Sequence, residues 1–210
     1  MALAAAEGVE ALSMRKLARH LDYEVMSLYN HIANKSDLLE AMVDRVAGEI
    51  DTPEIDLAWR PAVRLIATSA HEALLRHPWS APLWSSAWPG PNRWRLMEAL
   101  LDLLGNAGFP DDVADLAFHA VTLHINGFTQ QQITYRDQTA DGGEDEMLAR
   151  FETDVPEVEF PRIHEHMRYH RERDAGSDTP VDEFGYVLDL ILDGLEQARL
   201  TGTVGRDSGS

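Results

Sequence analysis

Apolar residues recur every three to four positions through most of the chain, and no stretch alternates apolar and polar residues for long. This spacing places apolar side chains along one face of a helix, whereas a strand would need a period of two. Proline, glycine and acidic residues separate the periodic segments. The pattern therefore predicts an all-α fold. The expected body helices span 57–77, 93–106, 110–135, 160–173 and 181–200, with a short irregular or helical piece at 79–88.

Residues 12–39 predict two short helices joined by a tight turn, with a third helix directly after them. Ser13 is a suitable N-cap for the first helix, because its hydroxyl accepts a hydrogen bond from a free backbone N–H. Asp22 tolerates the left-handed backbone that a tight turn between helices often needs. The second helix, at 25–32, has a mostly polar outer surface. This arrangement is typical of a DNA-binding helix-turn-helix, whose second helix enters the major groove.

Three motifs in this segment, MRKLA at 14–18, SLYNH at 27–31 and NKSDLL at 34–39, together resemble the TetR family of one-component transcriptional regulators. The resemblance is confined to the N-terminal quarter, and Asp22 stands where the family often has glycine. It implies an N-terminal helix-turn-helix joined to a helical-bundle domain that binds an effector and dimerises. Residues 1–8 resemble the last turns of the family's first helix, ending at Gly8 as a C-cap.

The resemblance also implies which side chains contact DNA. By position in the motif, Arg15 contacts a base edge, whereas Tyr29, His31 and Lys35 contact phosphates. Lys35 lies just before a helix that we expect at 36–50, where a phosphate can dock on the helix N-terminus and the ammonium together. The full expected DNA-binding set is Ser13, Met14, Arg15, Val25, Met26, Ser27, Tyr29, Asn30, His31 and Lys35.

The formal net charge of −18 is unusual for a DNA-binding protein until it is divided along the chain. Residues 13–35 contain four Lys or Arg and two Asp or Glu, a local excess of two positive charges. Residues 51–210 contain thirteen Arg and twenty-eight acidic residues. A small basic face on an acidic body suits a protein that touches DNA at one end only, with weak non-specific binding.

A proline-containing break at 51–56 marks the expected domain boundary. We expect a helix-turn-helix domain at 1–50, an effector-binding and dimerisation domain at 51–202, and a disordered glycine-rich tail at 203–210. The acidic segment 141–159 is expected to be a mobile loop that could cover a pocket mouth.

The helices at 110–135 and 181–200 carry broad apolar stripes, which suit either ordinary core packing or a subunit interface. The resemblance implies that the last two long helices form a four-helix bundle between two subunits. Leu188, Ile191 and Leu195 are the residues that we expect the partner subunit to cover. A two-fold symmetric homodimer would also match two half-sites of a palindromic operator in double-stranded DNA.

Four of the five tryptophans lie within residues 79–94. Aromatic side chains with a few polar groups suit a small-molecule pocket, but they equally suit a bundle core, and both interpretations stay open. No Lys and few Arg are expected there, which favours a flat, apolar effector that is neutral or cationic. The expected effector-binding set is Trp84, Trp88, Leu96, Leu100, His119, Asn126, Phe128 and Gln130.

Other chemistry is sparse. The absence of Cys excludes disulfides, thiolate metal sites and a cysteine nucleophile. His164, His166 and His170 include an i,i+4 pair that could hold a metal, although the surrounding charges favour a solvated face. There is no P-loop, no G-x-S-x-G motif, no apolar segment long enough to span a membrane and no signal-peptide core. We therefore expect a cytoplasmic protein with no cofactor, no bound metal and no membrane partner.

The sequence thus predicts a dimeric, all-helical transcriptional repressor that releases its operator when an effector binds. Two alternatives belong to other classes. One is an all-helical metal-dependent hydrolase that uses the scattered histidines, and the other is a helical adaptor that binds a protein.

Overall fold

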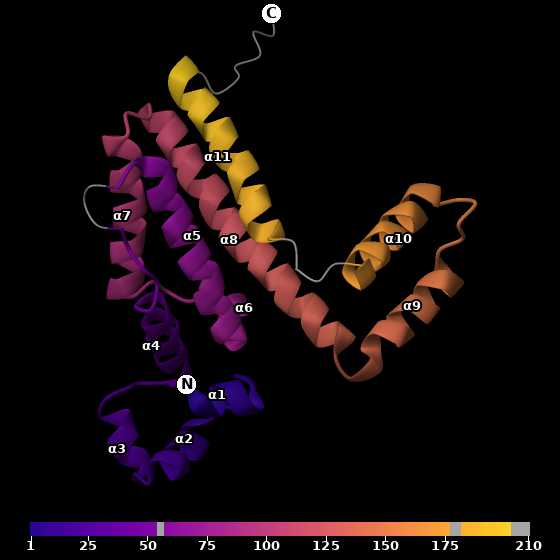
Figure 1. The fold of residues 1–210 in the computed structure, drawn as a ribbon. Coiled ribbons are helices and arrows are strands. Elements are labelled where there is room, and N and C mark those ends of the chain that lie inside the picture. The colour runs from indigo at the N-terminus through magenta and orange to yellow at the C-terminus, as the bar shows by residue number, and fades with distance from the viewer. Residues whose placement is uncertain (54–56, 177–181, 203–210) are drawn as a thin grey trace, which may run out of the picture.

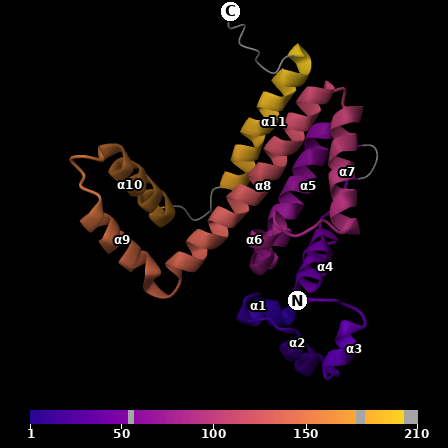
Figure 2. The ribbon, with the colours of Figure 1, turned by 180° about the vertical axis from the view of Figure 1, so that it is seen from behind.

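The computed structural model describes residues 1–53, 57–176 and 182–202, and these contain helices and no strand. The predicted all-α class is confirmed. Figures 1 and 2 show a small head formed by the first three helices, which α4 joins to a helical body. An arm formed by α9 and α10 projects away from the body at the end of the longest helix. None of the described helices is long and apolar enough to cross a membrane.

The head and its connection consist of α1 (Ala2–Glu7), α2 (Met14–Leu21), α3 (Val25–Tyr29) and α4 (Lys35–Ala47). Ser13 caps α2 as predicted, since its hydroxyl accepts a hydrogen bond from the Lys16 N–H at 3.3 Å. Asp22 ends α2 in the left-handed conformation, at φ 55°, which also agrees with the prediction. At α4, Asn34 accepts a hydrogen bond from the Asp37 N–H at 3.0 Å and thereby caps the connecting helix.

The body helices agree with the predicted ones apart from shifts of a few residues at their ends. The body contains α5 (Trp59–Arg76), η1 (Pro78–Ser80), α6 (Ala81–Trp84), α7 (Pro91–Asn106), α8 (Asp111–Thr139) and α11 (Glu183–Thr201). The longest, α8, lies against α5, α7 and α11 and forms the centre of the bundle. The expected disordered tail at 203–210 lies outside the described residues.

The acidic segment 141–159, expected to be a mobile loop, is largely helical, and that prediction is wrong. It contains η2 (Ala140–Gly142) and α9 (Gly143–Asp154), which is followed by α10 (Pro161–Gly176). Three acidic residues occupy the first turn of α9, where they interact favourably with the helix dipole. Phe151 lies against the His164 ring of α10, with ring centroids 4.7 Å apart. Helix-favouring charge placement and this contact outweigh the acidic composition.

Two histidines enclose a phenylalanine where α5, α8 and α11 meet. The Phe184 ring stacks on His71 at a centroid distance of 4.0 Å and on His124 at 4.6 Å. The Thr129 hydroxyl donates to the Ile125 carbonyl, so it accepts from His71 Nδ1 at 2.8 Å. Burial lowers the pKa of both imidazoles, and for His71 this exceeds the opposing effect of the Asp182 carboxylate. Both rings are therefore most stable in the neutral form.

This cluster predicts that the body loses stability on mild acidification. A histidine whose pKa is lower in the folded than in the unfolded chain binds fewer protons when folded. The free energy of unfolding should therefore fall as the pH drops below about 6.5, the ordinary histidine pKa. Urea unfolding at pH 7.5 and 5.5 should show this loss, and His124→Gln should reduce it. His119→Gln, which replaces an exposed histidine, is the control, and equal losses in both variants would contradict the prediction.

Candidate functional site

The head presents most of the expected DNA-binding side chains to solvent. Met26 is 73% exposed and Tyr29 is 45% exposed, and both extend from α3. Those exposed are Ser13, Arg15, Met26, Tyr29, Asn30 and His31, and those partly exposed are Val25, Ser27 and Lys35. Short loops leave α2 and α3 at the end of the molecule that is farthest from α11, as Figure 1 shows. This end can approach a duplex without interference from the body.

Met14 is a correction to the expected DNA-facing set. Its side chain is only 7% exposed and packs with Leu12 and Leu38 in the small core of the head. The first residue of α2 lies on the inner side of the helix, so a methionine there joins α2 to α4. Met14 therefore holds the head together and has no side-chain surface for DNA.

The positive charges of the head differ in their surroundings. Lys16 pairs with Glu7 of α1, which neutralises part of the local excess. The Lys35 ammonium lies 3.4 Å from the Glu10 carbonyl oxygen, at the N-terminus of α4. Arg15 and Arg19 are exposed on α2, and neither makes an ion pair within the described part of the chain. Their guanidinium groups are free to contact phosphates or bases.

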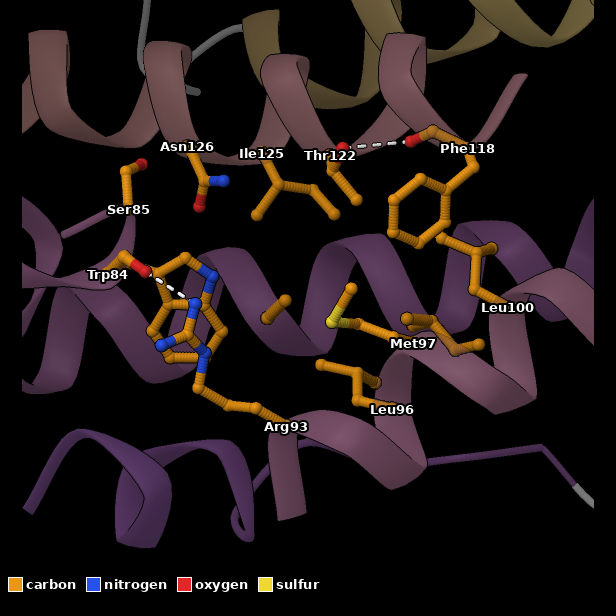
Figure 3. Close-up of a pocket in the computed structure, with 12 residues that line it drawn as sticks. Trp84, Ser85, Arg93, Leu96, Met97, Leu100, Phe118, Thr122, Ile125 and Asn126 are labelled. Carbon is orange, nitrogen blue, oxygen red and sulfur yellow. Dashed lines mark hydrogen bonds between the residues drawn. The ribbon is translucent and has the colours of Figure 1, made fainter. Parts of the chain in front are cut away.

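A cavity of about 200 Å³ lies in the body between α5, α6, α7 and α8. Figure 3 shows α7 and α8 on opposite sides of it, with Arg93 extending from one and Asn126 from the other. The cavity is lined by Ile66, Ala70, Trp84, Ser85, Arg93, Leu96, Met97, Leu100, Phe118, Thr122, Ile125 and Asn126. Most of this surface is apolar, as expected of a site for a small organic molecule.

Four of the eight residues expected to bind an effector line this cavity: Trp84, Leu96, Leu100 and Asn126. The structure places the other four elsewhere. Trp88 is 71% exposed and makes a T-shaped contact with the Trp94 ring, because the α6–α7 loop carries it outward. The His119 side chain is 58% exposed and turns toward Asp115 of the same helix.

The remaining two corrections also follow from the position of α8 between its neighbours. Phe128 packs against Phe184 and the half-buried rings of His71 and His124, on the side of α8 that faces α11. Gln130 is exposed in a separate shallow groove on α8. His119 and Asn126, both expected to bind an effector, therefore do not share the cavity. Only Asn126 lies where α7 comes close enough to enclose it.

Arg93 and Asn126 are the polar groups that distinguish the cavity from ordinary core. The Arg93 guanidinium donates to the Ala87 carbonyl at 2.8 Å and the Trp84 carbonyl at 2.5 Å, and lies 5.1 Å from the centroid of the Trp84 ring. Burial lowers the pKa of this guanidinium and Asp44 opposes that effect, but an arginine remains charged at neutral pH. Asn126 Oδ1 is buried without a hydrogen-bond partner among the described residues. The lining contains no Lys and a single Arg, which agrees with the expectation of no Lys and few Arg.

The N-terminus of α7 is capped from outside by a carboxylate of α4. The buried Asp44 side chain accepts hydrogen bonds from the backbone N–H of Arg93 at 2.9 Å and that of Asn92 at 3.3 Å. The Asn92 side-chain amide also donates to the Asp44 carbonyl at 3.1 Å. A Cβ on Gly90 would collide with the Asp44 carboxylate, so this close approach needs glycine. The helix that carries the head is therefore joined to a residue that lines the cavity.

Sequence reasoning missed both Asp44 and Arg93. Asp44 stands between Val43 and Val46, so an acid within the apolar stripe of a helix was a visible signal. Arg93 had no such signal, since charged residues are common in the first turn of a helix. Its role depends on the path of the α6–α7 loop, which brings two carbonyl groups to its guanidinium.

The expected dimer residues differ in exposure. Leu188 is wholly buried within the subunit, against α8, so a partner cannot cover it, and this expectation is wrong. Ile191 and Leu195 are partly exposed. Two other apolar side chains face solvent more fully: Leu190 on α11 is 56% exposed and Leu123 on α8 is 70% exposed.

The histidines of α10 form local contacts. His164 Nε2 lies 2.7 Å from the Val155 carbonyl, and the His166 and His170 rings touch with centroids 4.4 Å apart. No group of three or more His, Cys, Asp or Glu side chains in the described ranges is arranged to hold a metal ion.

Comparisons with known proteins agree with these features. Residues 1–42 match the family described as "Bacterial regulatory proteins, tetR family", and residues 52–199 match "Tetracyclin repressor-like, C-terminal domain". The transcriptional repressor DrrR1 of Streptomyces coeruleorubidus is 32% identical, over 92% of this chain and 73% of that protein. The tetracycline repressor protein class C of Escherichia coli is 29% identical, over 92% and 85% of the two chains.

A solved structure extends the likeness to the whole fold. The TetR family protein ActR of Streptomyces coelicolor, in complex with actinorhodin, superimposes with a TM-score of 0.73 at 28% identity. The alignment covers 94% of this chain and 93% of ActR. These matches are to regulators, and so the alternatives of a metal-dependent hydrolase and of a protein-binding adaptor are wrong. The chain belongs to the TetR family and is a DNA-binding transcriptional repressor whose activity an effector regulates.

Proposed function

We propose that this repressor binds a palindromic operator as a homodimer and releases it when a small molecule occupies the cavity between α7 and α8. One observation carries the proposal: Asp44 of α4 holds the backbone of Arg93, and the Arg93 side chain lines the cavity. A ligand that moves Arg93 must also act on the helix that carries the DNA-binding head. ActR, which has a similar fold, forms a complex with actinorhodin, and this supports regulation by a small organic molecule.

DNA recognition rests on the exposed surface of α3 and the adjoining end of α2. Helix α3 offers Met26 and Tyr29 to the major groove, the exposed Asn30 and His31 follow its last residue, and Arg15 is exposed on α2. An arginine in this place can donate two hydrogen bonds to a guanine. Lys35, at the N-terminus of α4, provides a charge and nearby backbone N–H groups for a phosphate.

Arg15→Ala and Lys35→Ala should therefore weaken operator binding in different ways. The first should relax the preference at one base pair by about 1–3 kcal/mol, because a base contact is lost. Lys35→Ala should weaken binding to all DNA sequences alike, because a phosphate contact is lost. It should also lower by about one the slope of log affinity against log salt concentration. Fluorescence anisotropy on an operator selected from random DNA measures both effects. Arg150→Ala, on the distant arm, is the control, and wild-type binding by both head variants would refute the assignment.

The proposed dimer face combines the solvent-facing sides of α8 and α11. On α11, Leu190 and Gly194 lie four residues apart and both are exposed. On α8, Leu123 and Gly127 repeat this spacing, so each helix has a leucine next to a site without a side chain. Residues four apart share a helix face, and small residues allow helices to approach closely. Two such faces, related by a two-fold axis, would form a four-helix bundle.

Leu190→Glu and Leu123→Glu should each raise the dimer dissociation constant by at least about a hundredfold, since an unpaired charge would be buried. Both leucines are exposed in the single subunit, so the variants should fold normally. Analytical ultracentrifugation measures the assembly and circular dichroism checks the fold. Leu101→Glu, on the outer side of α7, should remain dimeric. A stable dimer in both test variants would remove this face from the interface.

Control by the effector follows from linkage. A ligand that binds better when the heads are splayed necessarily binds the DNA-bound protein less well. Movement at the N-terminus of α7 reaches α4 through the Asp44 carboxylate, whose hydrogen bonds fix the relative position of the two helices. The contact is buried, so its geometry changes little without motion of both helices.

A side chain that fills the cavity should act as a permanent ligand. Thr122→Phe adds a ring to the lining and should weaken operator affinity by roughly tenfold, within the usual range of coupling free energies. Adding Asp44→Ala should reduce this effect to threefold or less, because the connection to α4 is broken. Leu101→Phe, away from the cavity, should leave operator affinity unchanged. Unaltered affinity in a folded Thr122→Phe protein would mean that the cavity does not control DNA binding.

A further inference from the structure

The chemistry of the cavity limits which molecules can occupy it. Of the twelve residues that line it, Arg93 alone carries a charge. Within the described chain Arg93 makes no ion pair, and the Asp44 carboxylate that lies nearest to it accepts hydrogen bonds from backbone and amide N–H groups. A guanidinium has five N–H donors, and the Trp84 and Ala87 carbonyls accept from two of its nitrogens. Donors therefore remain for a ligand oxygen.

A second polar group faces Arg93 from the other wall. Asn126 extends from α8 into the cavity, and its Oδ1 atom is buried without a donor from the described residues. A buried acceptor without a partner is unfavourable, and a ligand hydroxyl or N–H would provide the missing hydrogen bond. The Thr122 hydroxyl does not provide this donor, because it donates to the Phe118 carbonyl of its own helix. Asn126 thus marks a place for a hydrogen-bond donor on the ligand.

The rest of the lining is apolar and partly aromatic. Trp84, Phe118 and Met97 surround the space between the two polar groups. A cavity of ~150 Å³ holds benzene, so about 200 Å³ suits a ring system of one or two fused rings. Flat aromatic molecules bury most of their surface in such a site and meet its ring faces.

From these features we infer that the effector is an aromatic acid, whose carboxylate or phenolate binds Arg93 and whose hydroxyl or N–H donates to Asn126 Oδ1. This inference rests on the proposed function, in which this cavity is the effector site. It replaces the expectation of a neutral or cationic effector, because a cation would meet the Arg93 charge in a medium where repulsion is poorly screened. A purely apolar molecule would leave Asn126 Oδ1 and the remaining N–H donors of Arg93 without partners.

Isothermal titration of the full-length protein with 6-hydroxy-2-naphthoate and its primary carboxamide tests the charge. The acid should bind at least about tenfold more tightly than the amide, as expected for a hydrogen bond to a charged group. Arg93→Gln should abolish this preference and Arg93→Lys should retain part of it. Asn126→Asp places a carboxylate in the same cavity and should weaken binding of the acid but not binding of the amide. This variant tests the charge without altering the Arg93 contacts to the α6–α7 loop.

The hydroxyl is tested in the same way. The hydroxylated acid should bind more tightly than 2-naphthoate, and Asn126→Leu should remove the difference. Equal binding of acid and amide, or no binding of the acid at millimolar concentration, would overturn the inference. If acid and amide bind equally well and Thr122→Phe abolishes binding of both, the cavity is a ligand site and only the ligand class is wrong. If the acid binds Thr122→Phe as well as it binds the wild type, it binds outside the cavity, and the inference is refuted. The operator affinity of the same variant separately tests the proposed function.

Discussion

The buried carboxylate of Asp44 is the interaction on which the arrangement of this repressor depends. It supplies acceptors to the first free N–H groups of α7, a role that a residue of the same helix would ordinarily fill. Its negative charge also lies at the positive end of the α7 dipole. Because the acceptor comes from α4, the connecting helix cannot move without disturbing the start of α7. The need of the free N–H groups of α7 for acceptors is therefore met by a contact between α4, which carries the head, and the body.

The cavity owes its position to the same helix end. Arg93 lies one turn into α7, so its backbone meets Asp44 while its side chain reaches the carbonyl groups of the α6–α7 loop. The guanidinium closes one wall and Asn126 of α8 closes the other. In the proposed mechanism, the Arg93 side chain recognises the effector and the Arg93 backbone transmits its binding to α4. This explains how a cavity in the bundle can influence a head that lies beyond α4.

The body tolerates such a cavity because α8 provides a rigid centre. It packs on α5, α7 and α11, and its fully buried residues include Val113, Val121 and Thr129. The half-buried histidines beside Phe184 form part of the same centre, and their neutral form is favoured there. The side of α8 that is left exposed carries Leu123 and Gly127, so one helix contributes to the core, the cavity and the proposed dimer face.

The sequence by itself determined the features that depend on neighbouring residues. The helical periodicity fixed the all-α class and most body helices, while Ser13 and Asp22 fixed the ends of α2 through capping and left-handed backbone geometry. Local patterns also predicted that α3 has an exposed outer surface, on which Met26 and Tyr29 lie. They failed for residues 141–159. The acidic composition suggested a loop, whereas the acidic residues lie in the first turn of α9, where they favour a helix.

Only the tertiary structure decided which side chains meet across helices. Periodicity gives the face of a residue but not its neighbour, so Trp88, His119, Phe128 and Gln130 were assigned to a cavity that they do not line. Leu188 was assigned to the dimer face for the same reason, although α8 covers it. Asp44 and Arg93 acquire their roles from helices and loops that are distant in sequence. Their function depends on long-range packing, which no local pattern of residues specifies.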